Sequence, residues 1–385
     1  MLLGLLTFTD TFGYAIVLPV LPFAAQRMHL GALVIGGVFA TYSFCQLLAA
    51  PVLGSLSDRY GRRPLLLVSQ AGSIVGFIVL ALANSAGWFY LSRLIDGLTA
   101  GNIAIIWAAV LDHYPRSEWG RRFANLSTAT GIGILLGLIV SSLLARYGLA
   151  LVAAVAIALT VINMAVTLFA FPAANVVPAR AGWGIRLAGA RFIELVTRPS
   201  NAVTRRVVFA GLLSTIVQSA FLLAFPLFLF RLLHFDASQA ALTLTVLFGF
   251  AAAFQVLALA PLVRRLGDRG AAIAGFALVV PGAVTIAMVR TFPLVLLAGT
   301  IIMWGIVLLN PSLTALLGRA NRTLDEGAIM GVNQSIASAG QMLGPLAGYA
   351  ALALASTAGY GALCAVLAAA GLIMSLQIRV RDDRP

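Results

Sequence analysis

Three charged residues lie inside otherwise apolar stretches: Asp10 in "LTFTDTFGY", and Arg93 with Asp96 in "LSRLIDGLTAG". A charge at the centre of a bilayer costs roughly 2.5–3.5 kcal/mol on insertion scales, and residues of this kind are functional by default. Burial opposes ionisation of a carboxyl group, whereas a neighbouring guanidinium favours it. An aspartate near an arginine can therefore exchange a proton near neutral pH, and this is the chemistry that we expect.

Each carboxylate needs a helix to place it at depth. Asp10 lies about 12 Å into its apolar run at the helical rise of 1.5 Å per residue. Arg93 and Asp96 are three positions apart and share one helix face. We expect this face to continue along the same helix as a stripe that lines a cavity, through Ala100, Ala104 and Trp107.

Three roles are open for the embedded acids. Asp10 or Asp96 can carry a coupled proton, form a structural salt bridge with Arg93, or bind a cationic substrate. The second half of the chain has no acid inside any predicted span, because the loops hold Asp236, Asp268, Asp325 and Glu326. A carboxylate that carries a proton should therefore belong to the first half.

The composition predicts a polytopic helical membrane protein. Of 385 residues, 61% are hydrophobic and only 10% are charged, against about 25% charged in soluble proteins. Apolar runs of 18 or more residues recur along the chain. We predict an all-α membrane fold with twelve spans, at roughly 2–23, 32–54, 65–84, 90–111, 122–145, 148–170, 206–230, 238–262, 271–290, 293–317, 328–354 and 358–378.

The longest gap divides the spans into six plus six. We expect an N-terminal six-helix bundle over 1–170, a cytoplasmic linker over 171–205 and a C-terminal six-helix bundle over 206–385. An amphipathic helix near 185–196 should lie on the membrane surface. We expect no cleavable signal peptide, and we expect a short native N-terminal tail to be missing from this sequence.

The arginines predict the orientation. All 25 basic residues are arginine, which excludes a Walker A ATPase and a lysine Schiff base. Twenty arginines fall on the side that holds both termini and four on the other. We therefore expect both termini to be cytoplasmic, and we expect the protein to lie in the inner (plasma) membrane. The net charge of +13 is then topological, and we expect no nucleic-acid partner.

Two landmarks recur at nearly one spacing. Gly61 and Gly267, each after the second span of its half, are 206 positions apart, and Gly137 and Gly344 are 207 apart. We predict two pseudo-symmetric six-helix units. Such repeats are common in transporters, where the substrate site lies at their interface near the midplane.

The most specific motif is "GSLSDRYGRRPLLL", residues 54–67, which we place in a tight cytoplasmic turn. Gly54 and Gly61 permit close backbone approach, and Asp58 can pair with Arg62 where screening is weak. The motif resembles G-x-L-x-D-R-x-G-R-[KR] of the major facilitator superfamily. The matching positions are Gly54, Asp58, Arg59, Gly61, Arg62 and Arg63.

The resemblance covers most of the chain. Span 1 ends "GYAIVLPVLP", span 4 carries Arg93 and Gly97 in the family's R-x-x-x-G pattern, and span 11 contains "GQMLGPLAG". These features resemble the drug:proton antiporter branch, which includes tetracycline and multidrug exporters. The resemblance implies that Asp58, Arg62 and Asp112 form a charge relay that locks the outward-facing state. It also favours Asp10 over Asp96 as proton carrier, because the family repeatedly places an acid at this point of span 1.

Some positions depart from that branch. Its span-5 pattern G-x-x-x-G-P-x-x-G-G is here "GILLGLIVSS", with Leu138 in place of proline and with Ser141 and Ser142 in place of glycines. A helix without proline should bend less, which weakens antiport relative to symport or uniport. Tetracycline exporters carry an acid in span 9 and a histidine in span 8, where this chain has Val279 and Ala251. Tetracycline itself is therefore not favoured as substrate.

We predict a proton-coupled exporter of lipophilic or amphipathic small molecules that is monomeric, has no cofactor or metal and works by alternating access. A facilitator or proton symporter for a sugar, organic acid or lipid-like metabolite is the main alternative. A membrane-embedded sensor without transport comes next, and an enzyme is least favoured. Polar and aromatic residues in the spans either face a substrate cavity or bond between helices; they are Tyr14, Tyr42, Gln46, Trp107, Gln218, Gln255, Asn310 and Asn333.

Overall fold

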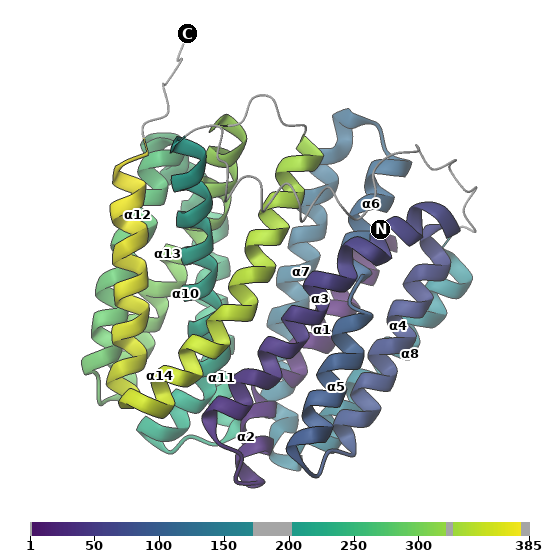
Figure 1. The fold of residues 1–385 in the computed structure, drawn as a ribbon, viewed down its shortest axis with the longest axis horizontal. Helices are drawn as coiled ribbons and strands as arrows, with labels where there is room; N and C mark the ends of the chain where they lie inside the picture. The colour runs from purple at the N-terminus through teal and green to yellow at the C-terminus, as the bar shows by residue number, and fades with distance from the viewer. Residues whose placement is uncertain (1, 172–201, 321–325, 379–385) are drawn as a thin grey trace. The chain divides into compact units, whose positions relative to one another are not determined.

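The computed structural model describes residues 2–171, 202–320 and 326–378, which are almost entirely helical (Figure 1). Its first six helices are α1 (Leu2–Val17), α2 (Val20–Arg27), α3 (Ala32–Tyr60), α4 (Arg62–Ala81), α5 (Ala86–Leu98) and α6 (Asn102–His113). These are followed by α7 (Arg116–Leu144), the 3-10 turn η1 (Ala145–Tyr147) and α8 (Leu149–Ala170). The remaining elements are α10 (Ala202–Leu233), α11 (Ala237–Phe254), the π-helix η2 (Gln255–Leu259), α12 (Ala260–Met288), α13 (Phe292–Ala320) and α14 (Glu326–Leu376).

Ten stretches of the described chain are long and apolar enough to cross a membrane. Two of them, Ala237–Met288 and Val332–Leu376, pass through residues with non-helical backbone angles, Gly267 and Ser356. Each of these two therefore comprises two spans, and the described chain holds the twelve that the sequence predicts. The all-α membrane fold is confirmed, whereas the amphipathic helix expected near 185–196 lies outside the described residues.

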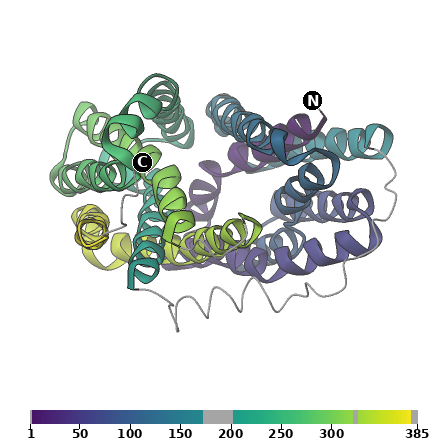
Figure 2. The same cartoon turned by 90° about the horizontal axis from the view of Figure 1, so that it is seen from above.

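The described residues divide into two compact units, those within Met1–Ile185 and Phe235–Thr245 and those within Arg186–His234 and Val246–Pro385. In the first unit α1 packs against α7 and α8, and α4 packs against α5 and α8. In the second unit α10 packs against α14, and α12 packs against α13 and α14. Figure 2, seen from above, shows the helices of each unit gathered side by side.

The backbone repeats itself between the two units. Six described residues have a positive φ angle, and they form three pairs at similar spacing: His29 with His234, Gly61 with Gly267, and Gly148 with Ser356. The members of these pairs are 205, 206 and 208 positions apart. Because L residues rarely adopt positive φ, three matched pairs are strong evidence for the duplication that the sequence predicts.

Two predicted spans are not continuous helices. Span 1 is interrupted between α1 and α2 at Leu18 and Pro19, since proline has no backbone N–H to continue the helical ladder. Span 4 is interrupted between α5 and α6 over residues 99–101. The span predicted at residues 90–111 is present, within Ala86–His113, but it is not one continuous helix.

Small residues bring α7 close to α1, the helix that carries Asp10. A Cβ atom at Gly133 would lie 2.7 Å from the carbonyl oxygen of Phe8, and one at Gly137 would lie 2.8 Å from that of Phe12. One turn further, the Ser141 hydroxyl donates a 2.8 Å hydrogen bond to the carbonyl of Ile16. Such seams let helix backbones pack closely in a membrane, so Ser141 contributes to the packing that its glycine neighbours permit.

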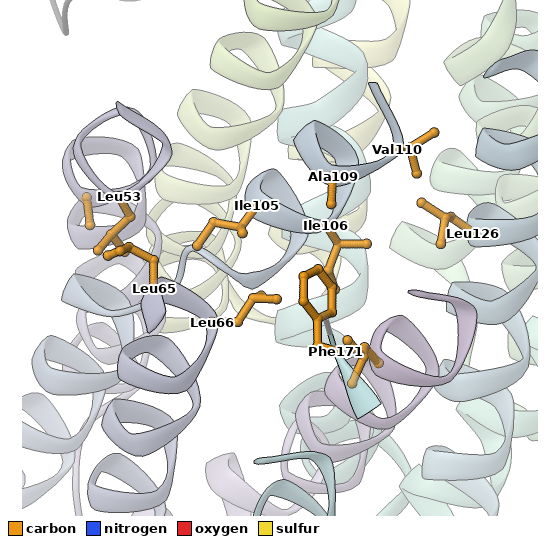
Figure 3. Close-up of a cluster of buried hydrophobic side chains, with 11 residues drawn as sticks. Leu53, Leu65, Leu66, Ile105, Ile106, Ala109, Val110, Leu126 and Phe171 are labelled. Atoms are coloured by element: carbon orange, nitrogen blue, oxygen red, sulfur yellow. The ribbon is translucent and has the colours of Figure 1, made fainter. Parts of the chain in front are cut away.

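A buried apolar cluster packs around α6 in the first unit (Figure 3). Leu53 of α3 and Leu66 of α4 contribute from one side, Ile106 of α6 from the centre and Leu126 of α7 from the other side. Phe171 also belongs to it, and its ring lies near Ile106 in the close-up. The cluster fixes α6, and thereby the residues at both ends of α6, relative to α3, α4 and α7.

We predict that Ser356→Gly stabilises the protein. Ser356 has φ 72° and ψ −172°, a region open essentially to glycine alone, and the strain is of order 1–3 kcal/mol. Its counterpart Gly148 has φ 97° and ψ 172°, and a Cβ there would meet no described atom within 4 Å. Gly148→Ser should therefore lower the melting temperature through backbone strain alone, while Ser356→Gly raises it. Thermal unfolding in detergent measures both, and equal melting temperatures for all three proteins would contradict the prediction.

Candidate functional site

Asp10 of α1 is held by an amide. The side-chain Nδ2 of Asn102 donates a 2.6 Å hydrogen bond to Asp10 Oδ1. Asn102 is the first residue of α6 and is only 6% exposed. The sequence analysis did not single out Asn102; its one signal was its position between a run of small residues and the next apolar turn. Asp10 makes no ion pair with any described residue.

The break before Asn102 is stabilised by a buried serine. The Ser69 hydroxyl of α4 donates to the carbonyl of Thr99 and accepts a 3.1 Å hydrogen bond from the Gly101 N–H. These backbone groups would otherwise lack partners in an apolar interior, which costs free energy. A Cβ at Gly101 would lie 2.8 Å from Leu53, so α3 packs tightly against the break.

The break also corrects one sequence-based expectation. Ala100 lies within the interruption, and Ala104 and Trp107 belong to α6 rather than to the helix of Arg93 and Asp96. The Trp107 ring packs edge-on against Phe123 at 5.6 Å, beside the apolar cluster of Figure 3. The predicted continuous stripe is wrong, because a helix face does not extend across non-helical backbone.

Arg93 and Asp96 compensate each other on α5. Arg93 Nη1 lies 3.2 Å from Asp96 Oδ2, and the two residues are 4% and 6% exposed. The other oxygen of Asp96 accepts a 2.9 Å hydrogen bond from the Ser73 hydroxyl of α4. The guanidinium also lies over the rings of Tyr42 and Phe77, 5.9 Å from each centroid. Asp96 thus has a cation and a hydroxyl as partners.

The two embedded acids therefore have different electrostatic surroundings. Asp96 and Arg93 form a buried pair with no net charge, and removing one partner of such a pair is strongly destabilising. Asp10 accepts a hydrogen bond from a neutral amide and forms no ion pair with any described residue. Asp10 can gain a proton without breaking an ion pair, whereas protonation of Asp96 leaves Arg93 with an uncompensated charge.

Two predicted cavity residues of the first unit lie beside this pair. The rings of Tyr14 on α1 and Tyr42 on α3 are 6.1 Å apart, and Tyr14 is 37% exposed. Gln46 lies one turn along α3 from Tyr42 and is half-buried. The structure thus brings a polar and aromatic surface of α1 and α3 next to the Arg93 guanidinium.

The cavity residues that the sequence predicts in the second unit are all neutral amides. Gln218 of α10 and Asn310 of α13 lie 3.5 Å apart, with the amide of Asn310 donating. Gln255 is exposed and begins the π-helix η2, and Asn333 is half-buried in α14. Sequence reasoning missed the stacked rings of Phe254 and Trp304, whose centroids are 5.1 Å apart. Phe254 directly precedes η2, and π-helices often mark functional sites.

The predicted gating motif forms a charge cluster. Arg62 Nη1 lies 2.5 Å from Asp58 Oδ1, and Arg62 Nε lies 2.8 Å from Asp112 Oδ2 at the end of α6. Arg62 also donates to the Ser57 hydroxyl. These contacts place Arg62 between two carboxylates, one from α3 and one from α6.

Neighbouring motif residues have other surroundings. Arg63 donates to the carbonyl of Leu168 on α8, and the Arg59 guanidinium lies 5.4 Å from the Tyr60 ring centroid. Only Gly61 lies between α3 and α4, so the turn that the sequence predicts is this one residue, and the rest of the motif is helical. Gly54 lies within α3, and a Cβ there would meet no described atom within 4 Å.

The second unit repeats the ion pair with opposite polarity. Arg319, at the end of α13, lies 2.6 Å from Asp268 Oδ2 on α12. Asp268 follows Gly267 as Arg62 follows Gly61. Arg319 is 207 positions beyond Asp112, so acid and base have exchanged places. In both units, an ion pair joins the residue after the positive-φ glycine to the end of the fourth span.

Comparisons with known proteins agree with this architecture. The model of the Major Facilitator Superfamily matches residues 3–201 and 207–385. The class D tetracycline resistance protein of Salmonella ordonez is 29% identical, covering 89% of this chain and 86% of that protein. Multidrug resistance protein 2 of Bacillus subtilis (strain 168) is 24% identical, covering 89% and 85%.

Among solved structures, nucleoside transporter NupG superposes with a TM-score of 0.75 at 15% identity, covering 98% of this chain and 97% of that one. That likeness shows the fold alone. The resemblance to tetracycline and multidrug exporters that the sequence indicated is confirmed by the curated relatives. With a family model that spans nearly the whole chain, this protein is a multi-pass membrane transporter that belongs to the Major Facilitator Superfamily.

Proposed function

We propose that this transporter exports lipophilic or amphipathic small molecules in exchange for protons, by alternating access, and that Asp10 carries the proton. A proton from outside neutralises Asp10 and releases the substrate outward. Loss of that proton to the cytoplasm resets the carrier. The curated relatives named for tetracycline and multidrug resistance support the efflux direction.

One observation carries the choice of Asp10. Its carboxylate contacts a neutral amide, whereas Asp96 is paired with Arg93 and hydrogen-bonded by Ser73. A proton carrier must be able to lose and regain its charge within one transport cycle. Protonation of Asp10 changes the net charge of the site without leaving a buried guanidinium alone, so Asp10 is the less costly place for the proton.

The ion pairs of Arg62 and of Arg319, near the ends of their helices, have a gating role in this proposal. Arg62 with Asp58 and Asp112 ties α3 and α4 to the end of α6, and Asp268 with Arg319 ties α12 to the end of α13. Breaking or forming such pairs shifts the balance between two arrangements of the helices, and a shift of this kind is what alternating access requires.

The setting follows from the family and from the arginines. We propose that the protein works as a monomer in the inner membrane with both termini cytoplasmic, because arginines are concentrated on that side. The cycle requires a small-molecule substrate and protons, but no cofactor and no nucleic acid.

A facilitator or proton symporter for a metabolite remains the second candidate. It is favoured by α7, which runs without interruption over Arg116–Leu144 and has Leu138 where the antiporter pattern has proline. Substrate counterflow that persists without a pH gradient and without proton movement would select it over the exporter.

Asp10→Asn and Asp96→Asn should separate proton coupling from stability. In proteoliposomes, Asp10→Asn should abolish uptake of ethidium or rhodamine 6G driven by a pH gradient, with little change in melting temperature. Asp96→Asn should destabilise the protein by about 3–5 kcal/mol, because it leaves Arg93 buried without its partner. Gradient-driven transport of both dyes at the wild-type rate by Asp10→Asn would refute the assignment.

Exchanging the charges of the second ion pair tests its gating role. Asp268→Arg and Arg319→Asp alone should each slow dye transport several-fold, and the double variant should recover it, because it has the polarity of Arg62 and Asp112. The Arg319 side chain is 58% exposed, whereas the Asp268 side chain is 11% exposed, so Arg319→Asp should change stability less than Asp268→Arg. The melting temperatures of all three variants separate a loss of gating from a loss of folding. Initial rates of dye transport measure the effect. A double variant as slow as the single ones would show that the pair has no part in gating.

A further inference from the structure

Asn102 is incompletely satisfied in the state that the structure shows. Its Nδ2 donates to Asp10, while its Oδ1 is buried and has no hydrogen-bond partner among the described residues. Buried side-chain polar atoms normally have a partner. An unpartnered acceptor directly beside a titratable carboxyl group has an evident donor at hand once that group is protonated.

We propose that Asn102 is the positioning residue for the proton on Asp10. The amide donates through Nδ2 to the ionised carboxylate. When Asp10 takes up a proton, the amide turns end for end, and its Oδ1 accepts a hydrogen bond from the new carboxyl O–H. An amide is suited to this exchange because it carries two donors and an acceptor on one planar group. The inference rests on the proposed function, since it assigns a partner to the proton carrier.

The position of Asn102 in the fold favours this role over simple packing. It is the first residue after the break of residues 99–101, where Ser69 already satisfies the Thr99 carbonyl and the Gly101 N–H. The corresponding span of the second unit, α13, is a single helix over Phe292–Ala320. The interruption therefore occurs in the unit whose spans carry the acids.

Few charged groups surround this pair. On α5, the Asp96 carboxylate acts on Asp10 electrostatically, but it is paired with Arg93. Tyr42 of α3 and Tyr14 of α1 are the neighbouring phenols. Of the helices packed against α1, α8 has no charged or titratable residue. In the other three these residues lie toward the helix ends; they are Arg27 of α2, Asp112 and His113 of α6, and Arg116, Glu118, Arg121 and Arg122 of α7. Asn102 is thus the polar group in hydrogen-bond contact with Asp10.

Infrared titration of the purified protein in detergent tests the proposal without a known substrate. The carboxylic-acid band lost in Asp10→Asn assigns the Asp10 signal, and its pH midpoint is then measured in Asn102→Leu. A hydrogen bond to an ionised group is about twice as strong as a neutral one. Its loss should therefore let protonated Asp10 persist to higher pH, raising the midpoint by about one pH unit. Asn102→Ser, which keeps a donor and an acceptor, should shift it less.

Asn163→Leu is the matched control. Asn163 of α8 is also buried, at 3% exposed, and its Oδ1 has no partner in the described part of the chain, but its Nδ2 donates to the carbonyl of Leu6 at 3.4 Å. It should leave the midpoint unchanged. The exchanged pair, Asp10→Asn with Asn102→Asp, again places one carboxyl opposite one amide and should regain a titrating band and gradient-driven dye transport.

The outcomes separate the two proposals. If Asp10→Asn removes no titrating band and leaves transport intact, the proposed function fails and the role of Asn102 fails with it. If Asp10→Asn abolishes coupling but the midpoint in Asn102→Leu and Asn102→Ser equals that of the wild type, only the role of Asn102 is overturned. An equal shift in Asn163→Leu would likewise overturn it, because the effect would then follow from any buried asparagine. Should Asn102→Leu fail to fold, Asn102→Ser and the exchanged pair decide the question.

Discussion

A charged side chain among apolar helices needs a polar or oppositely charged partner. In the first unit, the packing of the helices supplies such partners to Arg93, Asp96, Arg62 and Asp10. Arg93 and Asp96 neutralise each other, with Ser73 on the remaining carboxylate oxygen. Near a helix end, Arg62 lies between Asp58 and Asp112. Asp10 differs from these residues, since its partner is the amide of Asn102. Of the two acids embedded in the described spans, Asp10 is the one without a cation, which is the reason that the proposed chemistry centres on α1.

Backbone irregularities serve these partners. The gap between α5 and α6 turns the chain so that Asn102 begins a new helix opposite Asp10, and Ser69 supplies the hydrogen bonds that the gap removes. The Gly133–Gly137 seam brings α7 against α1, close to the same residue. Close packing on one side and a broken helix on the other leave the Asp10 carboxylate a defined polar neighbour.

The two units share a backbone plan and differ in chemistry. Three pairs of positive-φ residues at matching spacing show the shared plan. The seam of glycines also recurs, since a Cβ at Gly344 would lie 2.7 Å from the carbonyl of Ile216. The side chains have diverged: the second unit presents amides and stacked rings near a π-helix, and its ion pair of Asp268 with Arg319 has reversed polarity. A duplicated scaffold can retain its turns while its two halves take different tasks.

The sequence by itself determined the membrane spans, their number and the duplication, and it placed Arg93 and Asp96 on one helix face. These depend on local rules: apolar runs of membrane length, glycines at repeated spacing, and side chains three apart on one helix face. The partnership of Arg62 with Asp112 came from family resemblance, because nothing local joins residues 50 positions apart. Local rules failed at the break of span 4, where no proline or charge marks the end of the helix.

Only the tertiary structure decided which acid stands apart from a cation. Asp10 and Asn102 are 92 positions apart, and their contact depends on how α1 and α6 pack and on where α6 begins. Spacing along a chain specifies neighbours on one helix, whereas neighbours on different helices are set by the close fit of side chains across an apolar interior. That fit is a property of all the packed helices together, and it gives Asp10 the partner on α6 that spacing along the chain does not predict.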